Sequence, residues 1–265
     1  MTDAVQGGAT SRRRRASRAA VPAVVAVAGA VALAGCQTTQ DKSAALKAKA
    51  VAADKPRRLE LGRPSSDVRV RSRQQLSGPD GSALVVELEN RSSRALLRVP
   101  VSVRISQGGQ EQFANDIEGG DELLLRVPVL PPRGRVTWVN ANLPLVARGA
   151  DLRVALGAPT RRSKRPAEPL PVTGLKRDPD AVAGEPITVR GTVRNPLRRA
   201  QTEVPVYVTV REGGRVVAAG ASRVAEIAPG SRASFEAVLI GDGRRGRLAA
   251  RALPTKLPTS QRSTR

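Results

Sequence analysis

A single cysteine and a complete lack of histidine limit the side-chain chemistry open to this chain. A thiol can act as a nucleophile or accept an acyl group, and Cys36 is the one thiol present. Without histidine, Ser-His-Asp and Cys-His catalysis are excluded, together with the most common ligand of transition metals. The acidic residues are scattered along expected strands rather than gathered in a motif. We therefore expect no catalytic residue, no metal site and no cofactor, and a protein that is not an enzyme.

The residues before Cys36 explain what the thiol is for. A positive block, Arg12 to Arg15, precedes an almost wholly apolar run over residues 19–35, an order that is typical of a secretory signal. The run ends in Leu33-Ala34-Gly35-Cys36, which resembles the bacterial lipobox of an aliphatic residue, two small residues and cysteine. The resemblance implies that residues 1–35 are a signal peptide cleaved before Cys36, and that the Cys36 thiol carries a lipid.

The lipid determines the expected location. The resemblance implies a protein anchored to a membrane of the cell envelope by its N-terminal lipid, facing the periplasm or the exterior. The alternative is an uncleaved membrane anchor, but the apolar run is at the short limit for a helical span and contains Pro22 and Gly29. With its single cysteine lipidated, the chain has no disulfide and must fold on its apolar cores.

The chain is strongly basic, with a formal net charge of +22. Much of this charge lies in three segments whose composition indicates flexible chain: a tether over 36–58, a basic Pro-rich linker over 158–170 and a tail over 254–265. Charge on mobile chain attracts polyanions at long range. Six residues of the linker and the second domain are candidate contacts for a polyanion: Arg161, Arg162, Lys164, Arg165, Arg190 and Arg211. Nucleic acid is not expected as a partner, because aromatic platforms are scarce.

Two segments in which apolar residues occupy every second position have similar sequences. Val99, Val101, Val103 and Ile105 alternate with other residues, and valines recur at each position 105 residues later, from Val204 to Val210. This period is the signature of half-buried strands, and Gly-Gly pairs after each run are typical of hairpin turns. No long amphipathic helix is evident after residue 60.

The second half of the repeat has a shorter offset. Trp138 in the first copy corresponds to Phe235 in the second at an offset of 97, which indicates an insertion of about eight residues near Asn115 to Leu125 in the first copy. Both aromatic residues fall on the inward phase of their strands, so we expect them to be core anchors.

Together these features predict an all-β fold of two tandem immunoglobulin-like β-sandwich domains, over 59–157 and 171–253, after the signal peptide and tether. Residues 187–195, the segments VPVYVTV and GGRVVAAG, and Ile227-Ala228-Pro229-Gly230 with Phe235 resemble the FxLYD-type immunoglobulin-like domains of bacterial envelope proteins. The resemblance covers the second copy and, more loosely, the first. It implies neither catalysis nor a known ligand.

Several polar residues recur or cluster without requiring a function. Asn90 and Asn195 end equivalent strands, where asparagine commonly makes an Asx-turn. Tyr207 falls on the outward phase of its strand. Four acidic residues gather in the insertion of the first copy, and because their spacing matches no calcium loop, a solvated loop is expected there: Asp116, Glu118, Asp121 and Glu122.

Two functions fit these observations. The first is a non-catalytic, lipid-anchored envelope protein that acts as a protein-interaction or structural module, with an envelope protein as its partner. The alternative is a binder of anionic envelope polymers or lipid head groups through the basic linkers and the second domain.

Overall fold

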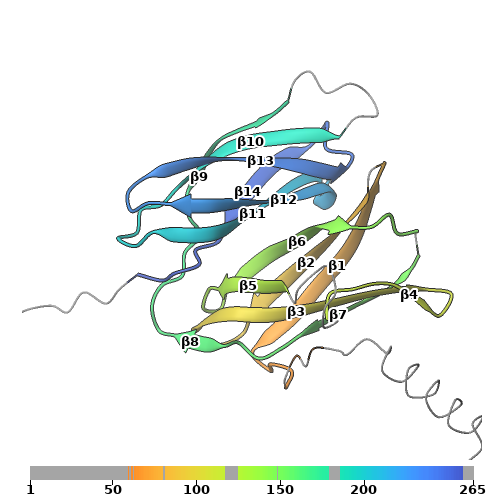
Figure 1. The fold of residues 1–265 in the computed structure, drawn as a ribbon, viewed down its shortest axis with the longest axis horizontal. Helices are drawn as coiled ribbons and strands as arrows, with labels where there is room; N and C mark the ends of the chain where they lie inside the picture. The colour runs from red at the N-terminus through yellow and green to blue at the C-terminus, as the bar shows by residue number, and fades with distance from the viewer. Residues whose placement is uncertain are drawn as a thin grey trace, which may run out of the picture. The chain divides into compact units, whose positions relative to one another are not determined.

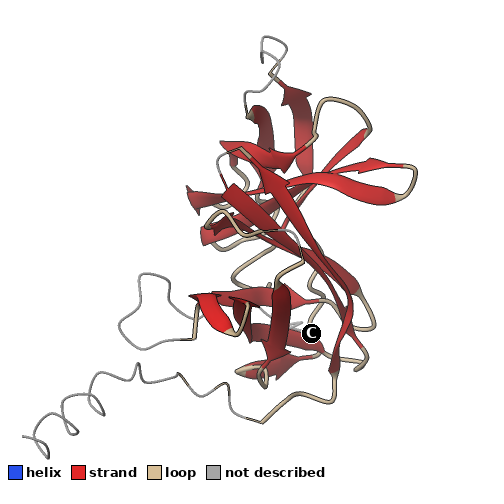
Figure 2. Cartoon of the chain, turned by 90° about the vertical axis from the view of Figure 1, so that its right-hand side faces the viewer, coloured by secondary structure: helices blue, strands red, loops and turns tan. Residues whose placement is uncertain are grey.

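The computed structural model describes residues 59, 61, 63–79, 81–116, 125–147, 149–178 and 186–258. The chain divides into two compact units, Met1–Asp54 and Lys55–Arg265, and every described residue belongs to the second. That unit is built from antiparallel strands, with no helix among its described residues (Figures 1 and 2). The expected all-β fold class is therefore confirmed. The described residues include no helix that could cross a membrane, and Leu33, Ala34, Gly35 and Cys36 lie outside them.

The first sandwich has two sheets. Its strands are β1 (Val68–Gly78), β2 (Gly81–Asn90), β3 (Ala95–Gln107), β4 (Gln110–Ala114), β5 (Leu125–Leu130), β6 (Arg135–Leu143), β7 (Asp151–Leu156) and β8 (Arg161–Ser163). One sheet has the order β1-β2-β6, so β6 forms an edge. In the other sheet β3 is central and pairs with β4, β5, β7 and β8.

The second sandwich repeats this plan. Its strands are β9 (Val172–Arg177), β10 (Ile187–Arg194), β11 (Gln201–Glu212), β12 (Arg215–Ile227), β13 (Arg232–Gly241) and β14 (Arg247–Ala252). The strand order is β14-β11-β12-β13-β10-β9. Here β10 and β13 correspond to β2 and β6, whereas β11 and β14 correspond to β3 and β7.

Strand pairing reproduces the sequence offsets residue by residue. Leu96 pairs with Leu130 in the first copy, and Gln201 pairs with Ile227 in the second, at offsets of 105 and 97. Left-handed backbone recurs as well: Arg98 has a φ of 52° and its counterpart Glu203 a φ of 53°. A non-glycine residue rarely adopts this conformation, so its recurrence marks a shared irregularity in the central strand of each copy.

The insertion accounts for the difference between the copies. In the first copy β4 ends at Ala114 and β5 begins at Leu125, whereas β12 runs through the equivalent region without a break. Ala218 and Ala219 of β12 also pair with β13, which joins the two sheets of the second sandwich along that side. Their equivalents in the first sandwich, Phe113 and Ala114, lie in β4, and within the described residues β4 pairs with β3 and not with β6.

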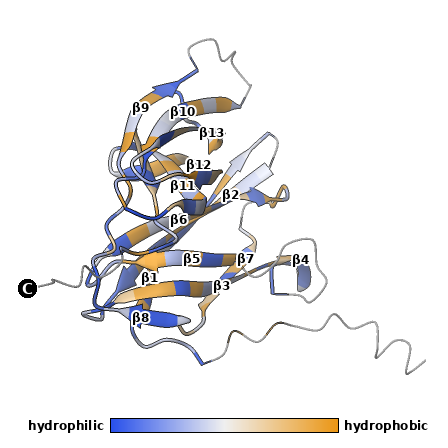
Figure 3. Ribbon diagram, turned by 60° about the vertical axis from the view of Figure 1, so that its left-hand side comes forward, coloured by the Kyte–Doolittle hydropathy of each residue, from blue (hydrophilic) through white to orange (hydrophobic). Residues whose placement is uncertain are grey.

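Each core follows the predicted alternation, which Figure 3 shows as bands of apolar and polar residues along the strands. The alternate valines of β3 and β11 are fully buried. Trp138 and Phe235 are 2% and 5% exposed, which confirms them as core residues. Trp138 lies opposite Val86, and Phe235 lies opposite Gly191. A Cβ atom on Gly191 would come within 2.7 Å of the Phe235 ring, so the ring occupies the space that the glycine leaves.

The two sandwiches pack against each other through an apolar contact. Tyr207, Val216, Ala219 and Ile240 of the second sandwich belong to the same apolar cluster as the core of the first. The Gln74 side chain donates a hydrogen bond across this contact to the Val216 carbonyl at 2.7 Å. Tyr207 points outward from its own sheet, as its phase predicts, yet it is only 6% exposed because the other sandwich covers it.

The expected linker and tail are more ordered than their composition suggested. Arg161–Ser163 form β8, which pairs with Ala95, Leu96 and Leu97 of β3. Ala167 and Leu170 are each only 3% exposed. In the tail Leu257 is buried, and residues 259–265 lie outside the described part. Backbone pairing does not require apolar side chains, so an arginine-rich segment can occupy a sheet edge while its side chains extend into solvent.

Candidate functional site

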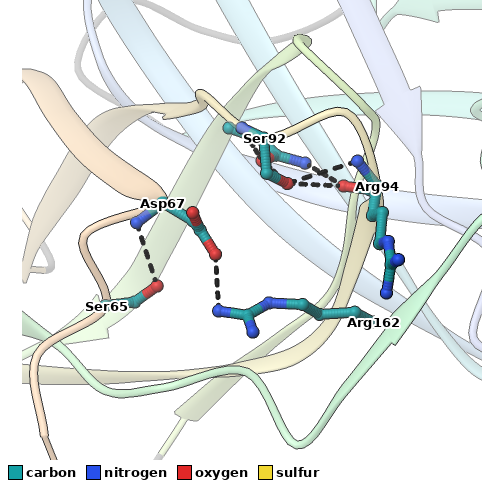
Figure 4. A network of polar contacts seen from close by, with 6 residues as sticks. Ser65, Asp67, Ser92, Arg94 and Arg162 are labelled. Atoms are coloured by element: carbon teal, nitrogen blue, oxygen red, sulfur yellow. Dashed lines mark hydrogen bonds and ion pairs between the residues drawn. The ribbon is translucent and has the colours of Figure 1, made fainter.

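The predicted basic contacts of the linker lie on and just after β8. The Arg162 guanidinium forms an ion pair with Asp67 at 2.5 Å, and the Asp67 backbone N–H donates to the Ser65 hydroxyl (Figure 4). Arg165 donates to the Pro258 carbonyl at 2.8 Å. Arg161 and Lys164 are exposed. Part of the charge assigned to this segment is therefore used in holding the segment against the rest of the fold.

The two predicted basic contacts of the second sandwich are far apart in the sheet. Arg190 lies on β10 and Arg211 on β11, with β12 and β13 between them in the strand order. Arg190 forms an ion pair with Glu236 at 2.9 Å, and this hydrogen bond together with the nearby carboxylates raises the pKa of the Arg190 guanidinium. Arg211 donates to the Gly214 carbonyl at 3.1 Å. The six predicted contacts thus do not form one surface.

A group of arginines that the sequence prediction missed gathers around the turn between β13 and β14. Arg247 lies directly opposite Arg211 in the β11–β14 pairing. Arg177 donates to the carbonyls of Gly243 and Gly246 in this turn, at 2.8 and 2.6 Å. We call the group the β13–β14 arginine cluster and define it as Arg177, Arg211, Arg244, Arg245 and Arg247. The run Arg-Arg-Gly-Arg at 244–247 was the available signal, but its closeness to Arg177 and Arg211 depends on the fold.

The recurring asparagines have the predicted structural role. The Asn195 Oδ1 atom accepts a hydrogen bond from the Leu197 N–H at 3.0 Å, which is an Asx-turn. Its amide nitrogen donates to the carbonyls of Arg199, Ile227 and Ala228. Asn90 makes the equivalent set of contacts in the first sandwich. Through these hydrogen bonds each asparagine links the end of its own strand to the loop that follows it and to the end of β5 or β12.

The acidic insertion differs from the expected solvated loop at Asp116. The Asp116 side chain is fully buried, forms an ion pair with Arg104 and accepts a hydrogen bond from the Ser102 hydroxyl at 3.1 Å. The hydrogen bond to Asp116 raises the pKa of the Arg104 guanidinium. Glu118, Asp121 and Glu122 lie outside the described residues. The part of the chain that the structure describes holds no group of three potential metal ligands.

A cavity of about 790 Å³ lies between the two sandwiches. Its walls come from β3, β5 and β6 of the first sandwich, from β11 and β12 of the second, and from the segment after β14. Trp138 and Tyr207 contribute aromatic surface. Burial raises the pKa of the Tyr207 phenol well above its ordinary value, and the charge of Arg223 acts in the opposite direction. Four cationic side chains also line the cavity: Arg98, Arg126, Arg223 and Lys256.

One polar group in the cavity wall is left unsatisfied. Asn140 is 5% exposed, and its Oδ1 atom accepts a hydrogen bond from the Asn142 N–H at 3.0 Å. Among the described residues, its Nδ2 atom has no hydrogen-bond partner. Asn140 pairs with Leu84 on the inner face of β6, and the equivalent residue of the second copy is Ala237, opposite Val189. Nothing in the sequence pattern marked this position, because Asn140 continues the phase of Trp138.

No family model matches this chain, and no curated protein matches it. Among solved structures, a transglutaminase from red sea bream is similar at 14% sequence identity and a TM-score of 0.21. The match covers 81% of this chain and 31% of the transglutaminase chain. A TM-score this low carries no argument about fold or activity.

Proposed function

We propose that this chain is a non-catalytic, lipid-anchored protein of the bacterial cell envelope that acts as a protein-interaction or structural module. The observation that carries the proposal is the union of two β-sandwiches into one body through a buried apolar contact that includes Tyr207, Val216 and Ile240. Such a body holds its outer surfaces in a fixed relation to each other, which suits the docking of a partner. The resemblance of the second copy to FxLYD-type, immunoglobulin-like domains supports the same role.

Lipid anchoring rests on the motif Leu33-Ala34-Gly35-Cys36. We expect mass spectrometry of the protein isolated from its native membrane to give an N-terminal peptide that starts at Cys36 and carries a diacylglycerol. The Cys36→Ser variant would leave an uncleaved or mislocalised precursor, since the acyl acceptor is gone. Full partition of that variant into detergent at mature size would contradict the proposal, because stable anchoring takes at least two acyl chains, and without the Cys36 thiol the variant cannot receive the diacylglycerol.

The interaction role is tested by crosslinking in intact cells, followed by purification under denaturing conditions. Recovery of one envelope protein, with crosslinks that map to strand residues of Lys55–Arg265, would support the module. The same experiment carried out with a variant that disrupts the inter-sandwich contact, Tyr207→Ala, gives the control. A partner that needs both sandwiches in a fixed relation should be lost in this variant, and unchanged recovery would contradict the role of the joined body.

The β13–β14 arginine cluster favours a second candidate, binding of anionic envelope polymers or lipid head groups. Arg211 and Arg247 face each other across a strand pair, and like charges so placed are unfavourable unless an anion accompanies them. Replacement of Arg244, Arg245 and Arg247 by glutamine should weaken binding to anionic vesicles.

A matched variant that removes three charges from the former linker separates the two basic regions. The replacements are Arg161→Gln, Arg162→Gln and Lys164→Gln, and they should matter less, because this segment is held in a sheet. Equal losses in both variants would show that only net charge matters. Vesicle binding that does not fall as salt concentration rises would contradict an electrostatic contact.

A further inference from the structure

The cavity between the sandwiches contains the free edge of β6, and we propose that this edge binds an extended, acidic segment of a partner protein. The segment adds to β6 as a fourth strand of the sheet β1-β2-β6. This inference deepens the proposed interaction role and rests on it, because it names the surface that the partner contacts and the chemistry of that partner.

The pairing of β2 with β6 fixes which backbone groups of β6 face the free edge. The Asn90 N–H donates to the Gly134 carbonyl at 2.9 Å, and bonding residues alternate along an antiparallel strand. The register continues without a shift as far as Asn140, so residues 135, 137 and 139 point their N–H and C=O groups away from β2. The Arg135 carbonyl confirms this direction, because it accepts a hydrogen bond from the Arg251 side chain of the second sandwich at 2.6 Å.

The backbone groups of Thr137 and Val139 have no strand beside them on this edge. Among the described residues β6 pairs only with β2. Val139 is 3% exposed, so water reaches its backbone poorly. Backbone N–H and C=O groups that neither pair nor reach water are costly. An added strand supplies the missing bonds, and this mode of peptide recognition draws its affinity from main-chain hydrogen bonds.

The lining of the cavity shows that the edge of β6, rather than one face, meets it. Consecutive residues from Trp138 to Asn142 line the cavity, whereas successive side chains of a strand point to opposite faces. In Figures 1 and 3, β6 lies between β5 on one side and β11 and β12 on the other, and residues of all three strands line the cavity. The cavity therefore occupies the place of a fourth strand between two neighbouring sheets.

The walls indicate which side chains the added segment carries. Trp138 and Tyr207 offer apolar surface. Glu203, the acidic residue of the lining, forms an ion pair with Arg223 at 3.1 Å. Exposed cations stand around the opening: Arg98, Arg126, Arg223 and Lys256. A segment that alternates apolar and acidic residues fits these walls. The C-terminal residues 259–265 of the chain itself have two arginines and no acidic residue, so their charge does not fit.

The chain contains a reporter, because Trp138 is its only tryptophan and lines the cavity. We would titrate the full chain, purified in detergent, with a peptide of about seven residues that alternates valine and glutamate and has blocked ends. We expect a saturable change in tryptophan fluorescence. At saturation, amide exchange of Thr137 and Val139, measured by NMR, should slow by about tenfold or more, because their N–H groups become bonded. No binding, or protection at another strand edge instead, overturns the proposal.

Two further peptides separate strand addition from attraction between charges. The same peptide methylated on every backbone nitrogen keeps its charge but cannot donate to β6, so it should not bind. A peptide with lysine in place of glutamate keeps the backbone donors but has the wrong charge, so it should bind at least about tenfold more weakly. Equal binding of the methylated peptide overturns strand addition, and equal binding of the lysine peptide overturns the acidic partner.

A pair of proline variants tests the edge itself. Thr137→Pro removes an N–H from the free edge and leaves the bonds to β2, so it should weaken peptide binding by about tenfold. Ser234→Pro is the matched control, because Ser234 lies at the equivalent position of β13, opposite Thr192 as Thr137 is opposite Glu87, and is outside the cavity. Unchanged binding in a folded Thr137→Pro, or an equal loss in Ser234→Pro, overturns the site. If Thr137→Pro does not fold, the methylated peptide decides on the native chain.

The peptide titration and the crosslinking in cells fail independently. Recovery of a crosslinked envelope protein without peptide binding overturns this site and leaves the interaction role in place. Absence of both a crosslinked partner and peptide binding overturns the two together.

Discussion

The side-chain amide of Asn195 offers a direct test of how the second sandwich is held together. Its nitrogen contacts three carbonyl oxygens at 2.9 to 3.1 Å, but two N–H groups can make only two full hydrogen bonds. The Oδ1 atom accepts a third bond from Leu197. At about 1 kcal/mol of net stability for each bond, Asn195→Ala should lower the free energy of unfolding by about 3 kcal/mol.

Urea denaturation followed by far-ultraviolet circular dichroism measures this change. We expect a lower midpoint with an unchanged denaturant slope, because the folded and unfolded surfaces stay nearly the same. If Lys55–Arg265 unfolds as one cooperative unit, the melting temperature should fall by about 6 to 12 °C, at roughly 2 to 4 °C per kcal/mol for a unit of this size. Asn90→Ala in the first sandwich is the matched control and should cost a similar amount.

A second substitution tests the direction of the hydrogen bonds. Asn195→Asp keeps the shape but places a carboxylate against three carbonyl oxygens, so it should cost more than alanine at neutral pH. The native fold would favour the protonated acid and raise its pKa above the unfolded value of about 3.9. The variant should therefore regain stability as the pH falls toward 4 and lose it as the pH rises. A loss below about 1 kcal/mol for Asn195→Ala would refute the reasoning.

Three further predictions concern other parts of the fold. Under limited digestion, trypsin should cut after Arg245 in the exposed β13–β14 turn before it cuts after Arg162, because β8 is paired with β3; the mass of the first fragments decides this. Burial raises the pKa of Tyr207, so the stability that the neutral phenol contributes is present below about pH 10 and is lost as the pH rises further. Denaturation measured between about pH 9 and pH 11 should show this loss in the native protein and a smaller loss in Tyr207→Phe. The tyrosinate absorbance of the single tyrosine should appear only on unfolding. Replacement of Arg104 by methionine should cost about 3 kcal/mol in thermal denaturation, because it removes a charged partner from the buried Asp116 carboxylate.

The strands could be predicted from sequence because the alternation of Val99, Val101 and Val103 depends only on which face of a strand each residue occupies. The offsets of 105 and 97 showed which residues of the two copies are equivalent and located the insertion. Equivalent strands are expected to pair in the same way in both copies. The Asx-turns at Asn90 and Asn195 were also predictable, because they rely on local geometry.

What could not be predicted depends on contacts between distant segments. The arginines of β8 predict a solvent-exposed segment. Its backbone pairing with β3 does not depend on the type of side chain, so the sequence does not reveal this pairing. The burial of Tyr207 arises because one sandwich covers the outer face of the other. Asn140 follows the inward phase of Trp138, so its type gave no sign of the unsatisfied amide, and the cavity between the sandwiches depends on contacts between distant strands.

The residue opposite each core aromatic on the neighbouring strand, Val86 for Trp138 and Gly191 for Phe235, also affects how the chain avoids misassembly while it folds. Two adjacent copies with the same strand order could exchange partners, so that β2 pairs with β13, a failure typical of tandem repeats. In that exchange Val86 would take the place of Gly191, where a Cβ atom already comes within 2.7 Å of the Phe235 ring. The reverse exchange would place Trp138 against Gly191 instead of Val86. Because each ring fits the residue opposite it, the two copies can share a strand order and still select their own partners.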